Sequence, residues 1–308
     1  MRAVVTGASG FLGVSLIERL LENGNEVLAV IRPNSLNLSR IPKYNVLSVV
    51  QIDANDISEL CLNVKNQYDT FFHLAWSGIR GNDRNDADLQ SKNYFNSVAA
   101  VETAFKIGCK TFVSTGSQAE CGIKNEVIDE NTSLEPVCEY GKSKVRCLNF
   151  EREYCYTHNM KFVWARIFSL YGKYDYSKSL INYAIDSMLQ NKQVNFSPCT
   201  QMWDYLNVSD ASRAILLAAE SEINDIVNIA DGNFKPLKDF IYEISDITKS
   251  NSKLVFADAL SWKTPLVNLC PDVSYLKKRT GFNANVSFRN GIEELIALKV
   301  KGKNNEKN

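Results

Sequence analysis

Tyr140 and Lys144 have the residue types and spacing best suited to acid–base chemistry. They open a helical pattern in which residues i and i+4 share a face, so we expect the Lys144 ammonium near the Tyr140 phenol. A phenol with a reference pKa of about 10 works near neutral pH only when a positive charge favours its anion. The same spacing recurs at Tyr174 and Lys178, but that pair lies in a polar loop and is disfavoured.

Ser117 is the hydroxyl expected to work with this pair. It follows an apolar strand over 111–114, which places it at the carboxyl edge of a parallel sheet, where ligands bind in this architecture. A hydroxyl there can hydrogen-bond a substrate oxygen while Tyr140 exchanges the proton. Alone, Ser117 fits a turn hydroxyl equally well. Together with Tyr140 and Lys144 it predicts a catalytic trio.

A glycine turn near the N-terminus predicts a site for a pyrophosphate. Gly7, Gly10 and Gly13 join an apolar strand to an amphipathic helix, where unpaired N–H groups and the helix dipole converge on an anion. The spacing also occurs in plain glycine-rich turns. Its place at the first strand–helix junction favours dinucleotide binding.

The ends of the second and third strands bear on the choice of cofactor. Arg32, with Ser35 nearby, stands where an acid would bind the ribose 2′-hydroxyl and where arginine accepts a 2′-phosphate. This favours NADP(H). NAD(H) is the alternative, with Arg32 only stacking over adenine. Asp53 fits a contact to the adenine amine, or it caps a helix that begins near Asp56.

A parallel sheet covered by helices is needed to bring these residues together. In the first half of the chain, short apolar strands alternate with longer helical patterns, which is typical of βα units. The predicted strands are 3–6, 26–31, 46–51, 70–74, 111–114 and 162–168, and the helices are 11–21, 56–66, 87–107 and 140–157. We therefore predict an α/β fold with a Rossmann-type doubly wound parallel sheet.

The pattern changes after Gly172, which predicts a smaller, mixed α/β C-terminal lobe for the substrate. Helices are expected near 179–189, 210–220 and 237–248. We assign residues 1–168 to an NAD(P)-binding domain and 169–298 to the substrate lobe, with some segments after 205 returning to the first domain. Residues 299–308 have no apolar face and are predicted to form a flexible tail.

Composition disfavours other functional classes. The 308 residues include 35 Lys+Arg and 35 Asp+Glu, so the chain lacks the basic field of a nucleic-acid or anionic-membrane binder. Two histidines, and eight cysteines without a C-x-x-C pair, predict no metal site. We expect reduced, mostly buried thiols. With neither a secretory start nor an apolar run of about 18 residues, we predict a cytoplasmic protein with no membrane or nucleic-acid partner.

Several motifs, in order, resemble the extended short-chain dehydrogenase/reductase family, in its NAD(P)-dependent nucleotide-sugar epimerase/dehydratase/reductase branch. The resemblance covers essentially the whole chain. The matching segments are residues 6–13, 73–75, 93, 117 with 122, 140–144, 165–172, 203–210, 228–232 and 271–273.

The resemblance implies NAD(P) on the N-terminal sheet and a nucleotide-diphosphate sugar in the C-terminal lobe. It also implies a homodimer through a four-helix bundle, for which the helices at 87–107 and 140–157 are the candidates. The residues it places at the cofactor are Gly7, Ser9, Gly10, Phe11, Leu12, Gly13, Arg32, Asp53, Leu74, Ala75, Tyr140, Lys144 and Phe168. At the substrate it places Ser117, Gln118, Ser169, Lys178 and Trp203, and it makes Ser117, Tyr140 and Lys144 catalytic.

Departures from the family pattern bear on the reaction. The family's 4,6-dehydratases carry an Asp-Glu pair after the catalytic hydroxyl, whereas Gln118 and Ala119 follow Ser117 here. Dehydratase chemistry is therefore disfavoured. Cys121 stands where an aromatic residue is frequent. Glu120 beside it is expected to be a surface or hydrogen-bonded carboxylate rather than an acid–base group.

Trp203 stands where the family often has an arginine that holds a phosphate. A tryptophan there stacks on a base or fills the core of the lobe. The diphosphate would then rely on Lys178, Lys192 or Arg213.

Three functions remain open. The favoured one is a nucleotide-sugar 4-ketoreductase, in which NADPH reduces a 4-keto-6-deoxy sugar for a surface polysaccharide and Tyr140 acts as the acid. Arg32 favours it, because net reduction draws on NADPH. The second is a C4-epimerase that retains NAD. The third is a non-catalytic cofactor-binding protein, which the intact trio of Ser117, Tyr140 and Lys144 disfavours.

Overall fold

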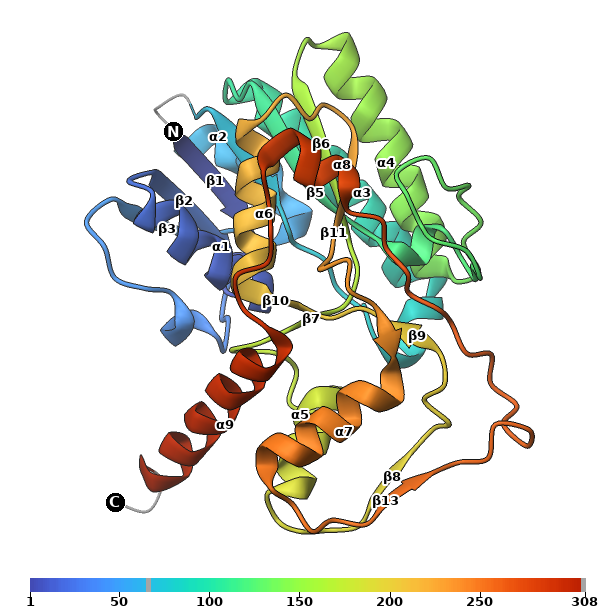
Figure 1. The fold of residues 1–308 in the computed structure, drawn as a ribbon. Helices are drawn as coiled ribbons and strands as arrows, with labels where there is room; N and C mark the ends of the chain where they lie inside the picture. The colour runs from blue at the N-terminus through green and yellow to red at the C-terminus, as the bar shows by residue number, and fades with distance from the viewer. Residues whose placement is uncertain (65–67, 306–308) are drawn as a thin grey trace.

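A parallel sheet forms the centre of the larger lobe (Figure 1). The computed structural model describes residues 1–64 and 68–305. Its seven strands have the order β11-β6-β5-β4-β1-β2-β3, so the direction of winding reverses between β1 and β4. The strands are β1 (Arg2–Thr6), β2 (Glu26–Ile31), β3 (Leu47–Gln51), β4 (Thr70–His73), β5 (Thr111–Ser117), β6 (Lys161–Ile167) and β11 (Ile226–Ile229). The predicted doubly wound Rossmann-type sheet is confirmed.

Helices cover both faces of this sheet. The described helices are α1 (Phe11–Glu22), α2 (Leu60–Asn63), α3 (Ala87–Lys106), α4 (Glu139–Thr157), α5 (Leu180–Met188), α6 (Val208–Glu220), α7 (Leu237–Thr248), α8 (Ser274–Thr280) and α9 (Phe288–Asn305). Short 3₁₀ segments are η1 (Leu38–Arg40), η2 (Ala54–Glu59), η3 (Gly81–Asn85) and η4 (Gln118–Glu120). The predicted helices over 11–21, 87–107, 140–157, 179–189, 210–220 and 237–248 correspond to α1, α3, α4, α5, α6 and α7.

Alternation along the strands explains the two layers, because successive side chains of a strand point to opposite faces. Ala3 and Val5 of β1 pack in one core with residues of α1 and α6. Val4 between them packs in the other core with residues of α3 and α4. Both faces are thus buried, as in parallel sheets generally.

The smaller lobe lies below the sheet in Figure 1 and consists of α5, α7, α9 and short strands. Its core includes Ile181 and Ile185 of α5, Ile241 of α7 and Ile292 of α9. The short strands are β7 (Leu170–Tyr171), β8 (Val194–Phe196), β9 (Met202–Trp203), β10 (Leu206–Asn207), β12 (Lys235–Pro236) and β13 (Leu254–Phe256). Between them in sequence, β11 returns to the main sheet beside β6.

Three segments differ from the sequence prediction. The helix predicted over 56–66 is the 3₁₀ segment η2, with a non-helical backbone at Asp56 (φ −111°, ψ 19°), followed by α2. The end of that prediction, 65–66, lies outside the described residues. Strand β5 continues as far as Ser117, because its pairing with β6 continues to that residue.

The third difference concerns the C-terminus. Helix α9 continues to Asn305, so the tail predicted from residue 299 begins inside a helix. Lys299 anchors it, because its Nζ donates to Asp186 Oδ2 of α5 at 2.9 Å. The remaining tail, 306–308, lies outside the described residues.

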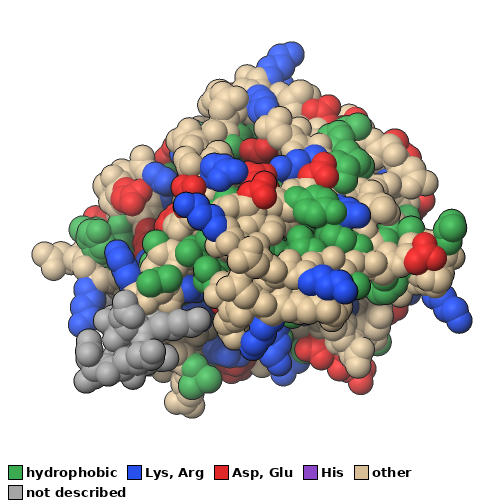
Figure 2. Space-filling view, turned by 60° about the horizontal axis from the view of Figure 1, so that its bottom comes forward, with side chains coloured by type: hydrophobic (Ala, Val, Ile, Leu, Met, Phe, Trp, Pro, Cys, Tyr) green, Lys and Arg blue, Asp and Glu red, His purple; other side chains and the backbone are tan. Residues whose placement is uncertain are grey.

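The surface and the thiols agree with the composition. All eight cysteines are free, and six are buried, as the reduced-thiol prediction requires. Acidic and basic side chains are interspersed over the face shown in Figure 2. In the described ranges, no helix is both long enough and apolar enough to cross a bilayer.

Candidate active site

The glycine turn between β1 and α1 has the close approaches that a cofactor cradle requires. Gly7 has φ +65°, and a Cβ there would lie 2.8 Å from the backbone nitrogen of Ala75. A Cβ on Gly13 would collide with the Gly7 carbonyl oxygen. Gly10, the N-cap of α1, provides no side chain to cap the first N–H groups, and the first turn carries no acid. These N–H groups and the helix dipole therefore fit a dinucleotide pyrophosphate.

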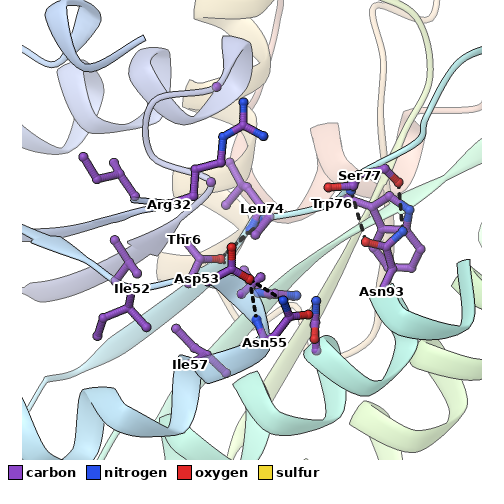
Figure 3. Close-up of a pocket in the computed structure, with 18 of the residues that line it drawn as sticks. Thr6, Arg32, Ile52, Asp53, Asn55, Ile57, Leu74, Trp76, Ser77 and Asn93 are labelled. Carbon is purple, nitrogen blue, oxygen red and sulfur yellow. Dashed lines mark hydrogen bonds between the residues drawn. The ribbon is translucent and has the colours of Figure 1, made fainter. Parts of the chain in front are cut away.

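A cavity of about 410 Å³ opens beside this turn (Figure 3). It lies at the carboxyl ends of β1, β2 and β4, the switch point where such sheets bind ligands. The predicted cofactor residues that line it are Gly7, Ser9, Gly10, Arg32, Asp53, Leu74 and Ala75. Phe11, Leu12 and Gly13 continue from the turn into α1. The shape and donor groups of the cavity fit NAD(P).

Arg32 and Asp53 occupy the same end of the cavity but differ in their partners (Figure 3). Arg32 is exposed, and it makes no ion pair with any residue of 1–64 or 68–305. Asp53 instead caps η2, because its Oδ1 accepts from Asn55 N at 3.1 Å and from Asn55 Nδ2 at 2.5 Å. Two roles were considered for Asp53, a contact to the adenine amine and a helix cap, and the structure shows the cap.

His73 is a structural residue at the base of the cavity. Its Nδ1 lies 2.9 Å from Thr6 Oγ1, and its Nε2 lies 3.1 Å from Ser97 Oγ of α3. Burial lowers the pKa of His73 to about 3, so the ring is neutral. Thr6 Oγ1 also accepts from Leu74 N at 3.2 Å and from Ala75 N at 3.4 Å. This network fixes the backbone that faces Gly7.

Ser117, Tyr140 and Lys144 converge between β5 and α4. Ser117 ends β5, and Tyr140 lies in the first turn of α4, where Cys138 caps the helix. All three side chains are buried, with exposures of 8%, 7% and 3%. The Lys144 Nζ donates to the carbonyl oxygen of Thr115 at 2.6 Å. The trio predicted from sequence is thus brought together.

Burial shifts the pKa values of Tyr140 and Lys144. It raises the pKa of Tyr140 to about 12, while a hydrogen bond with Ser117 and the charge of Arg84 oppose that rise. Burial also lowers the pKa of Lys144 to about 8. The phenol is therefore protonated at neutral pH and ready to donate.

Trp76 connects the cavity to the trio. It lines the cavity, and its ring centroid lies 3.5 Å from the Lys144 Nζ. Its ring also meets Tyr140 edge-on at 5.8 Å between centroids. The Trp76 Nε1 donates to Gln90 Oε1 at 3.0 Å, while Asn93 Nδ2 donates to the Ser77 carbonyl at 2.8 Å. The sequence signal for Trp76 is its place directly after the His73-Leu74-Ala75 motif.

Glu120 is fully buried beneath Ser117. Its Oε1 accepts from Ser117 N at 2.5 Å, while its Oε2 accepts from Trp164 Nε1 at 3.0 Å and lies 3.4 Å from Arg166 Nε. Burial raises its pKa, and Arg166 opposes that rise. Of the expected roles, Glu120 is the hydrogen-bonded carboxylate, and it holds the backbone of Ser117 in a capping box. Cys121 beside it is a buried thiol.

The predicted substrate residues come from several elements: Gln118 lies in η4, Trp203 in β9 and Lys178 just before α5. Phe168 and Cys121 pack in a small core to which Trp203 adds its half-buried ring. The Trp203 Nε1 is buried without a hydrogen-bond partner of good geometry among the residues that the structure describes. Gln118 and Ser169, both half-buried, directly follow Ser117 and Phe168.

The cations considered for the diphosphate differ in availability. Lys178 and Lys192 are exposed. Arg213 is not available, because its Nη2 donates to Asp210 Oδ1 at 2.9 Å and to the Asn283 carbonyl oxygen. The expectation for Arg213 is therefore corrected: it joins α6 to the segment before α9.

Comparison with known proteins agrees with this geometry. The family model of the NAD dependent epimerase/dehydratase family matches residues 3–230. An uncharacterized UDP-glucose epimerase of Bacillus subtilis is 25% identical over 96% of this chain and 97% of its own length. A dTDP-4-dehydro-6-deoxyglucose reductase of Escherichia coli is 24% identical over 95% of this chain and 96% of its own length.

Among solved structures, the UDP-glucuronic acid 4-epimerase of Bacillus cereus in complex with UDP-glucuronic acid and NAD has the same fold. The TM-score is 0.82 at 22% identity, over 96% of this chain and 98% of that one. The family match spans the glycine turn, the trio and the return of β11 to the sheet. The chain therefore belongs to the NAD dependent epimerase/dehydratase family and is an NAD(P)-dependent enzyme.

Proposed function

We propose that this enzyme is a nucleotide-sugar 4-ketoreductase that reduces a 4-keto-6-deoxy sugar, and that the sugar serves a surface polysaccharide. The observation that carries the proposal is the convergence of Ser117, Tyr140 and Lys144 next to a dinucleotide cavity. Arg32 at the rim of that cavity, which makes no ion pair with the residues that the structure describes, supports NADPH, the usual donor for net reduction.

In the proposed reaction the chain supplies the proton and the positioning. The glycine turn and the N–H groups of α1 would hold the pyrophosphate, and Arg32 would pair with the 2′-phosphate. When bound, the reduced nicotinamide supplies the hydride. Ser117 donates a hydrogen bond to the C4 oxygen, and Tyr140 transfers its phenolic proton to that oxygen as the carbonyl becomes a hydroxyl. Lys144 stabilises the resulting phenolate.

The residues after Ser117 support reduction over elimination. Gln118 and Ala119 provide no acid–base pair to remove water, and Glu120 is committed to the capping box. The reductase relative acts, by its name, on a dTDP-linked 4-keto-6-deoxy sugar, and the solved relative binds a UDP sugar. We therefore propose a nucleotide-diphosphate sugar as substrate, with Gln118, Ser169, Lys178 and Trp203 on its side of the site.

C4-epimerisation is the second candidate, and a specific observation supports it. An epimerase uses the same trio. The Bacillus subtilis relative, which aligns with nearly the full length of this chain, is a UDP-glucose epimerase by name. In that reaction NAD(H) would stay bound and the keto sugar would turn before it is reduced again.

Two further features support a homodimer and a reducing cellular compartment. Helices α3 and α4 pack side by side and expose Phe95, Phe105 and Tyr156, which supports a homodimer through these helices. The eight free cysteines support a reducing compartment, and we propose the cytoplasm.

Stoichiometry distinguishes the two reactions. The purified enzyme is incubated with dTDP-, CDP- and UDP-linked 4-keto-6-deoxy sugars and with UDP-glucose, and the products are identified by mass and NMR. A reductase consumes one NADPH per keto sugar and adds two hydrogens to it. Interconversion of UDP-glucose and UDP-galactose without added cofactor would reject the reductase and support the epimerase.

A further inference from the structure

Arg84 lies over the ring of Tyr140. Its guanidinium carbon is 4.7 Å from the ring centroid, whereas the Lys144 Nζ is 5.9 Å from the same point. The side chain is half-buried, and η3, which carries it, packs against α4. Of the two cations that approach the phenol ring, Arg84 is therefore the nearer.

The charge of Arg84 is available to Tyr140. Its Nη1 donates to the Ile79 carbonyl oxygen at 3.3 Å, and its Nη2 lies 3.7 Å from Cys138 Sγ. Within the described part of the chain it forms no ion pair. Arg80, on the same loop, contrasts with it, because Arg80 pairs with Asp175 at 3.3 Å.

Other groups face the phenol from its remaining sides, and their effects are of both signs. They are Ser117 and Glu120 from β5 and η4, Cys138 and Lys144 from the start of α4, and Trp76 from the loop after β4. Burial raises the pKa of Tyr140 most strongly; the hydrogen bond with Ser117 and the charge of Arg84 lower it, and Glu120 and Cys138 raise it further. The Lys144 ammonium also lies over the Trp76 ring and donates a hydrogen bond to the Thr115 carbonyl oxygen.

A cation over an aromatic face is attracted to the ring, and the attraction grows when the ring carries a negative charge. A guanidinium above Tyr140 therefore stabilises the phenolate more than the phenol. It also holds the ring in place between Trp76 and Ser117.

We propose that Arg84 is a positioning residue of the acid–base site, which holds the Tyr140 ring and assists transfer of the phenolic proton. The proposal rests on the proposed function, in which Tyr140 serves the C4 oxygen. In reduction, the O–H bond of Tyr140 breaks and a new O–H bond forms on the C4 oxygen as hydride is added to C4. The phenolate left behind lies under the guanidinium until solvent returns the proton.

The test is the pH dependence of kcat/KM for oxidation of the 4-hydroxy sugar that forms from dTDP-4-dehydro-6-deoxyglucose, with NADP⁺. Oxidation needs the phenolate, so its rate rises with pH as the fraction of phenolate grows below the pKa of Tyr140. Arg84→Gln should move this rise upward by about 0.5–1 pH unit, and Arg84→Lys by less, since it restores the charge without the planar contact. NADP(H) affinity, measured by fluorescence, should stay within about twofold of wild type.

Arg80→Gln is the matched control. It removes a guanidinium from the same loop, where Arg80 lies 4.5 Å over the ring of Tyr176 instead. Arg80→Gln should leave the pH profile of kcat/KM for oxidation where it is in the wild type. An unshifted profile in Arg84→Gln, or an equal shift in Arg80→Gln, would overturn the proposal. If Arg84→Gln does not fold, Arg84→Met, which also removes the charge, decides it: a profile displaced upward by about 0.5–1 unit supports the proposal, and a wild-type profile rejects it.

Tyr140→Phe separates this inference from the proposed function. Wild-type turnover in Tyr140→Phe would reject the proposed mechanism itself. An inactive Tyr140→Phe together with an unshifted Arg84→Gln would reject only the role of Arg84.

Discussion

Tyr140 and Lys144 are both buried, and burial drives both toward their neutral forms. It raises the pKa of the phenol to about 12 and lowers that of the ammonium to about 8. Sequence spacing places the two residues on one helix face, but it cannot show how each is solvated. In the folded site the lysine contacts Trp76 more closely than the phenol. The arginine that is nearer to the phenol comes from a loop far away in sequence.

Arg32 provides a prediction about cofactor choice. We expect Arg32→Asp to lower the ratio of NADPH to NADH affinity by about tenfold or more, because a charge-assisted bond to the 2′-phosphate is lost. Fluorescence titration with each reduced cofactor measures the ratio. Arg40→Gln is the control, since Arg40 lies over Tyr174 at 4.9 Å and does not line the cavity. An unchanged ratio in Arg32→Asp would remove Arg32 from cofactor selection.

Periodicity predicts the elements well where one face is clearly apolar. The amphipathic pattern of α1 and the continuous apolar run of β1 give their positions within a residue or two, since β1 is buried on both faces of the sheet. The segment η2 was missed because Asp53 caps a 3₁₀ turn where the sequence pattern predicts a helix. The end of β5 was missed because its last pairs depend on β6, which the local sequence does not contain.

The candidate site can be predicted from the sequence where a motif, or the end of a predicted strand, contains the functional residues. The glycine turn and Tyr140 with Lys144 each lie within a few residues of chain. The roles of Trp76, Arg84 and Glu120 depend on contacts between β4, β5 and α4. A motif can mark the position of Trp76, but the sequence does not show which residues these side chains contact.

Helix α4 buries a carboxyl group beyond Lys144. Glu151 is fully buried, and neither of its oxygens has a hydrogen-bond partner of good geometry among the described residues. Ser114 and Lys144 favour its charged form, but burial outweighs them and raises the pKa of Glu151 to about 8 from 4.5. The folded protein thus binds this proton more tightly than the unfolded chain.

The sign of the resulting pH dependence follows from linkage. Between about pH 4.5 and 8 the unfolded chain holds fewer protons at Glu151, so stability falls as pH rises. We expect Glu151→Gln to match wild type near pH 4.5 and to be more stable at pH 8.5, by on the order of 1–3 kcal/mol. Urea unfolding at both values measures this. The exposed Glu153→Gln should show no such trend, and a pH-independent difference in Glu151→Gln would contradict the burial argument.

At the scale of the whole molecule, the exposed aromatic side chains of α3 and α4 predict a dimer. Phe95 is 61% exposed on α3, and Tyr156 is 85% exposed on α4. We expect Phe95→Glu to weaken self-association about tenfold or more, because it places a charge in a buried contact. Sedimentation at several concentrations measures this. Tyr242→Glu, on α7 of the other lobe, should associate like wild type. A wild-type protein that stays monomeric at micromolar concentration would reject the dimer.

The return of β11 and α6 to the sheet after the first part of the lobe has a consequence for engineering. A cut after residue 168 would remove β11 from the edge of β6 and α6 from the face of α1. The first 168 residues would then lack a strand and half of one layer. The smaller lobe therefore cannot be exchanged as one continuous segment. Recombination with a relative would have to transfer its two separate stretches, before α6 and after β11, together with the crossing segments between them.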